Sequence, residues 1–189
     1  LAFRKELNAA LEKDGVRVTI NDMIIKAAAK ALAVHPNLNS TYDNDTLVRN
    51  TSLNIGIVIS VEQGLIVPSI TDCQSKSLVE IARATKVTIE RAQKGVMKPE
   101  EFAAATFAIS NLGMFDVENF IAVILPPHAA MLATGTVKAR PVVRDGQVVV
   151  RQTMTTTISV DHRVTDGVEA AIYLQEYKRY LEEPLLLLA

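Results

Sequence analysis

The amino-acid sequence has no tryptophan, a single cysteine and only three histidines, and its charges nearly cancel. The lone cysteine, Cys73, excludes an internal disulfide and a cysteine-rich metal site. His35, His128 and His162 are too few to build a standard zinc site without several carboxylates, so we expect no metal. With 20 basic and 21 acidic residues the net charge is -1, and no basic stripe stands out. This balance argues against nucleic acid as the main partner.

Long apolar runs are also missing. No run approaches the ~18 residues that a membrane-spanning helix needs, so we expect no membrane partner. Hydrophobic residues still make up 49% of the chain, so the apolar excess should lie in a core or at a subunit interface. A length of 189 residues fits one domain. Because the chain begins at Leu1 inside a helical pattern, we expect it to be part of a longer protein.

Hydrophobic spacing divides the chain into helical and extended segments. It predicts helices over 1–13, 23–34, 76–94, 99–104 and 168–183, the second preceded by a capping box from Thr19 to Asp22. It predicts strands over 38–42, 46–49, 53–61, 65–70, 105–110, 120–127, 131–139, 140–144, 147–152 and 153–160.

Turn residues at Asp43–Asp45, Glu62–Gly64 and Asp145–Gly146 predict three hairpins between these strands. The continuously apolar segment 120–127 predicts a strand buried on both faces. This mixture of helices and antiparallel hairpins predicts an α+β fold, with one sheet covered by helices on one face.

The densest polar cluster in an apolar setting is Asp161–Gly167, where a strand ends and the last helix begins. Asp166, followed three residues later by Glu169, predicts a helix N-cap with a reciprocal acid, and it leaves room for a second role at the site. His162 lies in the preceding turn. Because its ordinary pKa is close to neutrality, this side chain is suited to proton transfer.

Ser110 closes the predicted strand 105–110 within Ser110-Asn111-Leu112-Gly113. These residue types are common in turns, but a hydroxyl here could also donate a hydrogen bond to a developing oxyanion. No G-x-S-x-G elbow surrounds Ser110, and Cys73 lacks any local signature of a nucleophile. A buried or loop thiol is the better interpretation of Cys73.

The four leucines Leu185–Leu188 are unusual at a C-terminus. Burying each leucine contributes roughly 1.5–3 kcal/mol, and leaving all four exposed would favour aggregation. We therefore expect the tail to dock in a pocket of its own chain or of a neighbour, which favours an oligomer.

Several segments together resemble one known family. DHRVTDG at 161–167 resembles the H-x-x-x-D-G signature of the chloramphenicol acetyltransferase fold and of the dihydrolipoyl acyltransferases of 2-oxoacid dehydrogenase complexes. TFAISNLGMFDVENFIAVILPPHAAMLATG at 106–135 resembles the second signature block of these acyltransferases. GLIVPSITDCQSKSLVEIA at 64–82 and YLEEPLLLL at 180–188 are similar as well, so the resemblance covers essentially all 189 residues. The segment SNLGMF is most similar to the pyruvate dehydrogenase branch, which implies acetyl transfer.

The resemblance implies a two-layer sandwich, with a mixed, mostly antiparallel sheet covered by helices. It also implies a catalytic role for three residues. His162 would deprotonate the thiol of coenzyme A or dihydrolipoamide, Ser110 would stabilise the tetrahedral oxyanion, and Asp166 would support the geometry of the site. The thiolate would attack the acyl thioester directly, without an acyl-enzyme.

The resemblance further implies a homotrimer with its active sites between subunits, joined through the leucine tail into a 24-mer or 60-mer core. Coenzyme A and a lipoyl group carried on a separate domain would be the substrates. The partners would be the decarboxylase and dihydrolipoyl dehydrogenase components. A bacterial or archaeal cytoplasm is expected, with a mitochondrial matrix or plastid as alternatives.

Family members carry an N-terminal strand ahead of the first helix, preceded by lipoyl and peripheral-subunit-binding domains. We expect all of these to be absent from residues 1–189, which then form a single catalytic domain. Three alternatives remain at this point. They are a branched-chain or other 2-oxoacid acyltransferase, a catalytically inactive core subunit, and a thioesterase that uses Cys73 or Ser110 as its nucleophile.

Overall fold

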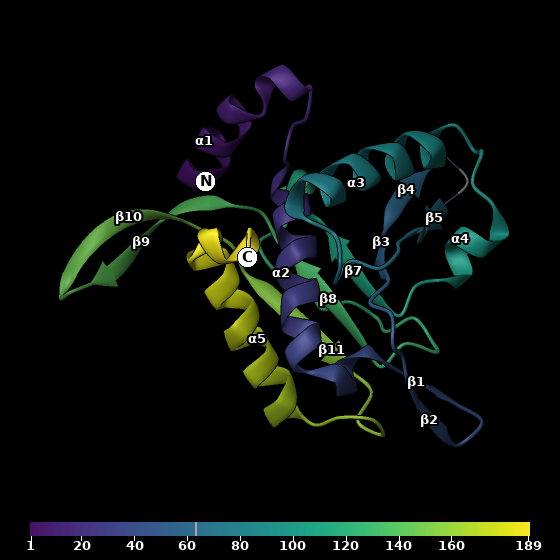
Figure 1. Cartoon of the computed structure of the whole chain (residues 1–189). Helices are drawn as coiled ribbons and strands as arrows, with labels where there is room; N and C mark the ends of the chain where they lie inside the picture. The colour runs from purple at the N-terminus through teal and green to yellow at the C-terminus, as the bar shows by residue number, and fades with distance from the viewer. Residues whose placement is uncertain (63) are drawn as a thin grey trace.

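The computed structural model describes residues 1–62 and 64–189, with helices packed on one face of a central sheet (Figure 1). The helices are α1 (Ala2–Ala10), α2 (Ile20–Val34), α3 (Leu78–Gln93), α4 (Pro99–Ala103) and α5 (Gly167–Glu182). The strands are β1 (Ser40–Asp43), β2 (Thr46–Arg49), β3 (Ile55–Ile57), β4 (Ile59–Val61), β5 (Gly64–Ile66), β6 (Ser69–Ile70), β7 (Phe107–Asn111), β8 (Ala130–Thr134), β9 (Lys138–Arg144), β10 (Gln147–Thr153) and β11 (Thr156–Val160). Within the described residues, no helix is both long and apolar enough to cross a bilayer.

The central sheet has five strands in the order β11-β8-β7-β3-β6. β8 and β3 run parallel to β7, whereas β11 and β6 pair antiparallel at the two edges. Three separate hairpins, β1–β2, β4–β5 and β9–β10, accompany this sheet. The described strands therefore form five antiparallel and two parallel pairs, which confirms the expected mixed, mostly antiparallel α+β fold.

Helix α2 lies at the centre of the helical layer, between α3 and α5. Its predicted capping box is present, because Thr19 accepts from the Asp22 amide and the Asp22 carboxylate accepts from the Thr19 amide. A helix that is apolar on all sides is typically buried, and here nearly every residue from Asp22 to Leu32 is buried. The many alanines of this segment let the neighbouring helices and the sheet approach closely on every side.

The predicted hairpins are present, with a refinement. β1 pairs with β2 around Asp43–Asp45, and β9 pairs with β10 around Asp145 and Gly146, whose φ angles of 51° and 75° suit a type I′ turn. The predicted strands 53–61 and 65–70 are each divided, so that β3 pairs with β6 and β4 with β5. The predicted turn at Glu62–Gly64 includes Gln63, which lies outside the described residues.

The prediction of a buried strand over 120–127 is wrong. Residues 120–125 form no strand and residues 126–127 lie in a turn, while Phe120 and Ala122 pack on the sheet face opposite the helices. The hydroxyls of Thr157 and Ser159 on β11 donate to the carbonyls of Phe120 and Ala122, each at 2.6 Å. Ile121 and Val123 point outward and are 83% and 88% exposed. A continuous apolar run shows no alternation of apolar and polar residues. It therefore did not distinguish a central strand buried on both faces from a segment whose outward apolar side chains are exposed.

The predicted docking of the leucine tail is confirmed in part. Pro184–Leu187 forms a 3₁₀ turn, and Leu187 is fully buried in the core of its own chain. Leu185 and Leu188 remain 72% and 54% exposed. The tail therefore packs Leu187, and in part Leu186, into its own fold and leaves Leu185 and Leu188 available for another surface.

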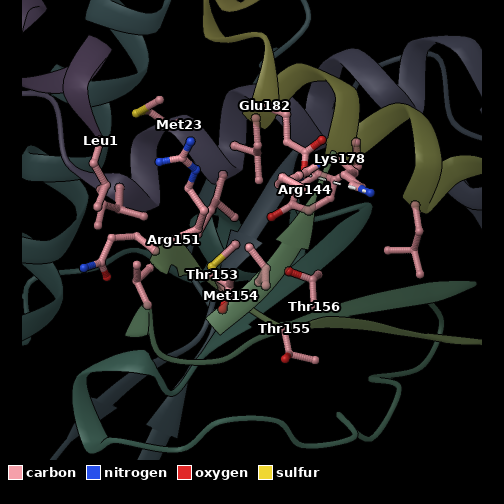
Figure 2. Close-up of a pocket in the computed structure, with 18 residues that line it drawn as sticks. Leu1, Met23, Arg144, Arg151, Thr153, Met154, Thr155, Thr156, Lys178 and Glu182 are labelled. Atoms are coloured by element: carbon pink, nitrogen blue, oxygen red, sulfur yellow. Dashed lines mark ion pairs between the residues drawn. The ribbon is translucent and has the colours of Figure 1, made fainter. Parts of the chain in front are cut away.

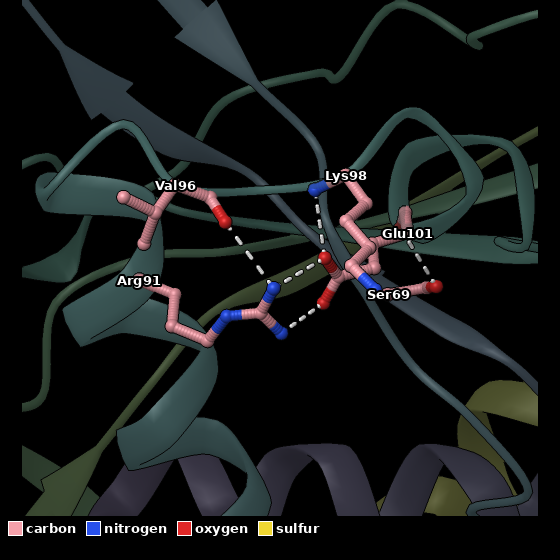
Figure 3. Close-up of polar contacts among 5 residues, drawn as sticks. All are labelled: Ser69, Arg91, Val96, Lys98 and Glu101. Atoms are coloured by element: carbon pink, nitrogen blue, oxygen red, sulfur yellow. Dashed lines mark hydrogen bonds and ion pairs between the residues drawn. The ribbon is translucent and has the colours of Figure 1, made fainter.

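Helices α3 and α4 are joined by a polar network around Glu101 (Figure 3). The Glu101 carboxylate accepts from the Arg91 guanidinium and from the Lys98 amide, and its carbonyl accepts from Ser69. The backbone hydrogen bond from Lys98, with the Arg91 contact, lowers the pKa of Glu101. This network fixes the connection that leads into β7, the strand that carries Ser110.

The buried ring of His128 leads to a prediction of how the free energy of unfolding depends on pH. Its ring is buried, Nε2 lies 2.8 Å from the Ala105 carbonyl, and Nδ1 has no partner among the described residues. Burial lowers the pKa of His128 below its ordinary value of 6.5. The unfolded chain then binds this proton more tightly than the folded chain does. The contribution of His128 to the free energy of unfolding is therefore fully present above about pH 6.5. It is lost as pH falls through the lower pKa of the folded state.

Urea unfolding from pH 8 to pH 5 checks this prediction, with His128→Gln as the matched variant. The glutamine amide can still donate to the Ala105 carbonyl but does not titrate. We expect its unfolding free energy to fall less steeply with decreasing pH. Because His35, His162 and all carboxylates are shared, parallel curves for the two proteins would contradict the assignment.

Candidate active site

The predicted His162 lies in a tight turn between β11 and α5. The Asp161 amide donates to the Ala129 carbonyl at 2.7 Å, which extends the pairing of β11 with β8 by one residue. The Asp161 carbonyl in turn accepts from the amides of Val164 and Thr165 at 2.9 and 3.2 Å. His162 is exposed, and its ring makes no hydrogen bond within the described part of the chain. The turn thus presents an imidazole to the surface on a well-bonded backbone.

Asp166 caps helix α5, as its position in the sequence predicts. Its Oδ1 accepts from the amides of Val168 and Glu169, both at 2.9 Å. The predicted reciprocal acid is wrong, because Glu169 turns away from the cap. Its carboxylate accepts from the Thr165 hydroxyl at 2.6 Å and from the Asn37 amide at 3.3 Å. The start of α5 is therefore tied both to its own turn and to the segment after α2.

Arg163 was not singled out from the sequence, yet it makes the most specific contacts of the turn. Its guanidinium bonds both oxygens of Asp161, with Nε–Oδ1 at 3.0 Å and Nη2–Oδ2 at 2.6 Å. Its Cζ lies 4.1 Å from the centroid of the Tyr42 ring on β1. Hydrogen bonds from Arg163 lower the pKa of Asp161. The spacing of Asp161 and Arg163 around His162 was a signal, but Tyr42 is too distant in sequence to have been paired with them.

Ser110 lies near the end of β7 on the open face of the sheet. Phe107 and Ile109 enter the core beneath the helices, whereas Ala108 packs in the small cluster on the opposite face. Because side chains alternate along a strand, Ser110 shares the face of Ala108. It is half-buried, and among the described residues its carbonyl, but not its hydroxyl, has a side-chain hydrogen-bond partner, the Thr134 hydroxyl. That hydroxyl is free to donate to a substrate.

Strand order separates the two predicted catalytic groups. Ser110 is aligned with Ala133 on β8, and Ala133 with Thr157 at the start of β11. His162 follows the far end of β11 at Val160. The rise of ~3.3 Å per residue puts Val160 about 10 Å along the strand from Thr157, and Ser110 lies two strands across. Ser110 and His162 are therefore at opposite ends of the sheet, and they cannot act together within one chain.

The other candidates do not join the site. Cys73 is buried and donates to the Ile70 carbonyl, and burial raises its pKa to about 11, so little thiolate exists near neutral pH. Within residues 1–62 and 64–189, no cluster of three or more metal-ligating side chains occurs. A cavity of about 790 Å³ lies between α2, α5 and the β9–β10 hairpin (Figure 2). Its lining contains neither Ser110 nor His162.

Comparison with known proteins places this geometry in a family. A model described as 2-oxoacid dehydrogenases acyltransferase (catalytic domain) matches residues 1–189. The dihydrolipoyllysine-residue acetyltransferase component of the pyruvate dehydrogenase complex of Zymomonas mobilis is 40% identical over 189 residues, which cover 100% of this chain and 43% of that protein. The chain thus spans less than half the length of this curated relative.

Two solved structures agree closely with this chain, each with a TM-score of 0.93, 29% identity and coverage of 100% of this chain and 78% of the other. One is the dihydrolipoamide acetyltransferase of Azotobacter vinelandii, investigated for the role of a serine, a histidine and an asparagine in its catalytic mechanism. The other is the cubic core of a pyruvate dehydrogenase multienzyme complex. Chloramphenicol acetyltransferase is similar in fold, with a TM-score of 0.55 at 12% identity over 92% of this chain and 82% of that one.

The fold is therefore that of chloramphenicol acetyltransferase, as expected. Because the family model matches the whole chain, the chain belongs to the 2-oxoacid dehydrogenase acyltransferases and corresponds to their catalytic domain.

The cap at Asp166 carries a prediction about stability. Asp166→Ala removes the acceptor for two helix amides and should lower the free energy of unfolding by about 1 kcal/mol. Asp166→Asn is the matched control, because its side-chain oxygen can still accept from the same amides. Urea unfolding at neutral pH separates the two. An equal loss in both variants would show that the charge of Asp166, rather than its cap, supports the turn.

Proposed function

We propose that this chain transfers an acetyl group between a dihydrolipoyl thiol and coenzyme A, the activity for which its relatives are named. One observation carries the proposal. The serine, histidine and asparagine investigated in the Azotobacter vinelandii enzyme have the same spacing along the chain as Ser110, His162 and Asp166 here. The third position differs, since this chain has an aspartate where that enzyme has an asparagine. Either side chain supplies the oxygen that caps α5.

Each group then has one role. His162 removes the proton from the thiol of coenzyme A, and the thiolate attacks the carbonyl carbon of the acetyl-dihydrolipoyl thioester. The Ser110 hydroxyl donates a hydrogen bond to the oxyanion of the tetrahedral intermediate. When the intermediate collapses, the carbon–sulfur bond to the dihydrolipoyl group breaks and that sulfur takes the proton back from the His162 imidazolium. Asp166 keeps the turn of His162 in place, and no acyl-enzyme forms.

The site is completed between two copies of the chain. His162 of one chain and Ser110 of another can meet, whereas those of one chain lie at opposite ends of the sheet. Exposed apolar side chains also follow Ser110 along the chain, among them Met114, Phe115, Ile121 and Val123. In a trimer with threefold rotational symmetry, one kind of contact between neighbouring chains repeats three times and covers the Ser110 face of the sheet in each chain. Its sites take coenzyme A and the lipoyl arm from opposite ends of a channel.

The trimers assemble further into a 24-mer or 60-mer core. A resemblance to the cubic core of a pyruvate dehydrogenase complex and the two exposed leucines of the tail support this assembly. The decarboxylase and dihydrolipoyl dehydrogenase would then act on the lipoyl arms of the same complex. A raised thiol pKa at Cys73 and the lack of a nucleophile elbow at Ser110 disfavour the alternative of a thioesterase.

A mixing experiment tests the site between chains. His162→Ala should lower turnover at least ~10²-fold, and Ser110→Ala about 10²–10³-fold. When the two inactive variants are dissociated, mixed equally and reassembled, every mixed trimer contains one site with both residues intact. We expect about a quarter of wild-type activity from such a mixture. The assay is acetyl transfer from acetyl-CoA to free dihydrolipoamide, with succinyl-CoA and isobutyryl-CoA in parallel.

Activity no higher than that of the separate variants would contradict a shared site. Near-native activity of His162→Ala alone would contradict the reaction itself. Faster transfer of the succinyl or isobutyryl group would assign the chain to another branch of the family.

The tail gives a separate prediction about assembly. Leu185 and Leu188 are exposed, so replacing both with serine should leave the trimer folded and active but prevent larger particles. Leu187→Ser is the contrasting variant, because Leu187 is buried in its own chain and its loss should lower stability by about 2 kcal/mol or more. Light scattering measures particle size, and an unchanged large particle in the double variant would exclude this role for the tail.

A further inference from the structure

The turn that carries His162 is attached to a distant part of the fold through one side chain. Arg163 lies between the Asp161 carboxylate, which it bonds at both oxygens, and the face of the Tyr42 ring at 4.1 Å. A guanidinium suits both contacts at once, because it is planar and presents its donors in a fixed fork. Tyr42 lies on β1 and Asp161 directly follows β11, so Arg163 connects two elements that do not pair with each other.

Both partners of Arg163 are anchored on the same short segment, residues 127–129. The Tyr42 amide donates to the Pro127 carbonyl at 3.1 Å, and the Asp161 amide donates to the Ala129 carbonyl at 2.7 Å. The Tyr42 ring is held further by its hydroxyl, which donates to the Asp45 carboxylate at 3.1 Å. The contacts of Arg163 with Asp161 and Tyr42 therefore link two segments that are both bonded to residues 127–129. His162 lies between Asp161 and Arg163 in the chain.

We propose that Arg163 and Tyr42 form a clamp that positions His162 for proton transfer. The inference rests on the proposed acetyl transfer, in which His162 is the base. The His162 ring is exposed and unbonded in its own chain, so burial does not set its direction. Its direction follows from the backbone of the turn. Misplacing a catalytic group by about 1 Å can cost about 10²-fold in rate, and the clamp limits such movement.

Two single variants each remove one partner of the contact between Arg163 and Tyr42. Arg163→Met removes the charge and the fork, and Tyr42→Leu removes the aromatic face. Each should lower kcat for acetyl transfer about 10-fold and leave the KM for coenzyme A and dihydrolipoamide within about twofold. Tyr42→Phe keeps the ring and should retain most of the activity. The double variant should be no worse than the poorer single variant, because both remove the same contact.

The chain offers a matched control at the other end of α5. Arg179 bonds both oxygens of Glu176 and lies over the Tyr180 ring at 4.9 Å, the same chemistry away from His162. Arg179→Met should therefore leave kcat unchanged. A comparable loss in Arg179→Met would show a general effect on the surface or on assembly, and it would overturn the clamp.

Amide hydrogen exchange provides a readout that does not depend on activity. The amides of Val164 and Thr165 bond the Asp161 carbonyl, and we expect them to exchange at least about 10-fold faster in Arg163→Met and Tyr42→Leu. Unchanged exchange together with unchanged kcat would overturn the proposal. So would a raised KM for coenzyme A at constant kcat, which would make Arg163 a cofactor contact. If Arg163→Met fails to assemble, the Tyr42→Leu and Tyr42→Phe pair decides.

The wild-type protein and His162→Ala, assayed in parallel, separate this proposal from the one on which it rests. No acetyl transfer by the wild type, or full transfer by His162→Ala, would reject the function. Transfer that depends on His162 but ignores Arg163 and Tyr42 would reject the clamp alone.

Discussion

The antiparallel pairing of β11 with β8 is the constraint on which the active site depends. Because β8 runs parallel to β7, β7 and β11 point in opposite directions and their carboxyl ends lie at opposite ends of the sheet. In a fully parallel sheet all carboxyl ends meet at one edge, where ligands bind. Here one end carries Ser110 and the other leads to His162. In the proposed mechanism these two residues are the oxyanion donor and the base, so the topology separates them and an assembly would have to bring them together.

The same sheet is covered unequally on its two faces. Helices α2, α3 and α5 bury one face, whereas the other is covered in part by the irregular segment 117–125, through Phe120 and Ala122. Ser110 lies on this second face, and a hydrogen bond to an oxyanion is strong only where water is excluded. Ile121 and Val123 of the irregular segment need burial for their own reason, since they are almost fully exposed. In the proposed trimer, one contact between copies of the chain would serve both requirements.

Local chemistry was predictable from the sequence wherever neighbours within a few residues decide it. The cap at Asp166 and the turn at Asp145–Gly146 are cases of this kind. Contacts set by tertiary structure were not predictable. Glu169 was expected to complete a capping box but bonds Asn37, far away in sequence, and 120–127 was expected to be a strand but is not. His162 and Ser110 were candidates from their local sequence and took their expected roles from a resemblance, and their separation emerged only from the strand order.

The role proposed for His162, a base that acts on a substrate held by a neighbouring chain, carries a conflict. Such a base has to be exposed in its own chain, so tight packing cannot hold it in one direction. Hydrogen bonds hold the turn of His162 on both sides. Before it, the Asp161 amide donates to the Ala129 carbonyl, and after it, the Asp166 carboxylate caps helix α5. These bonds hold the ends of the turn, and the Val164 and Thr165 amides bond the Asp161 carbonyl within it. Arg163 adds a contact from the turn to the Tyr42 ring on β1. The general requirement is that precision at an exposed catalytic group must come from polar and aromatic contacts, because they direct a side chain without covering it.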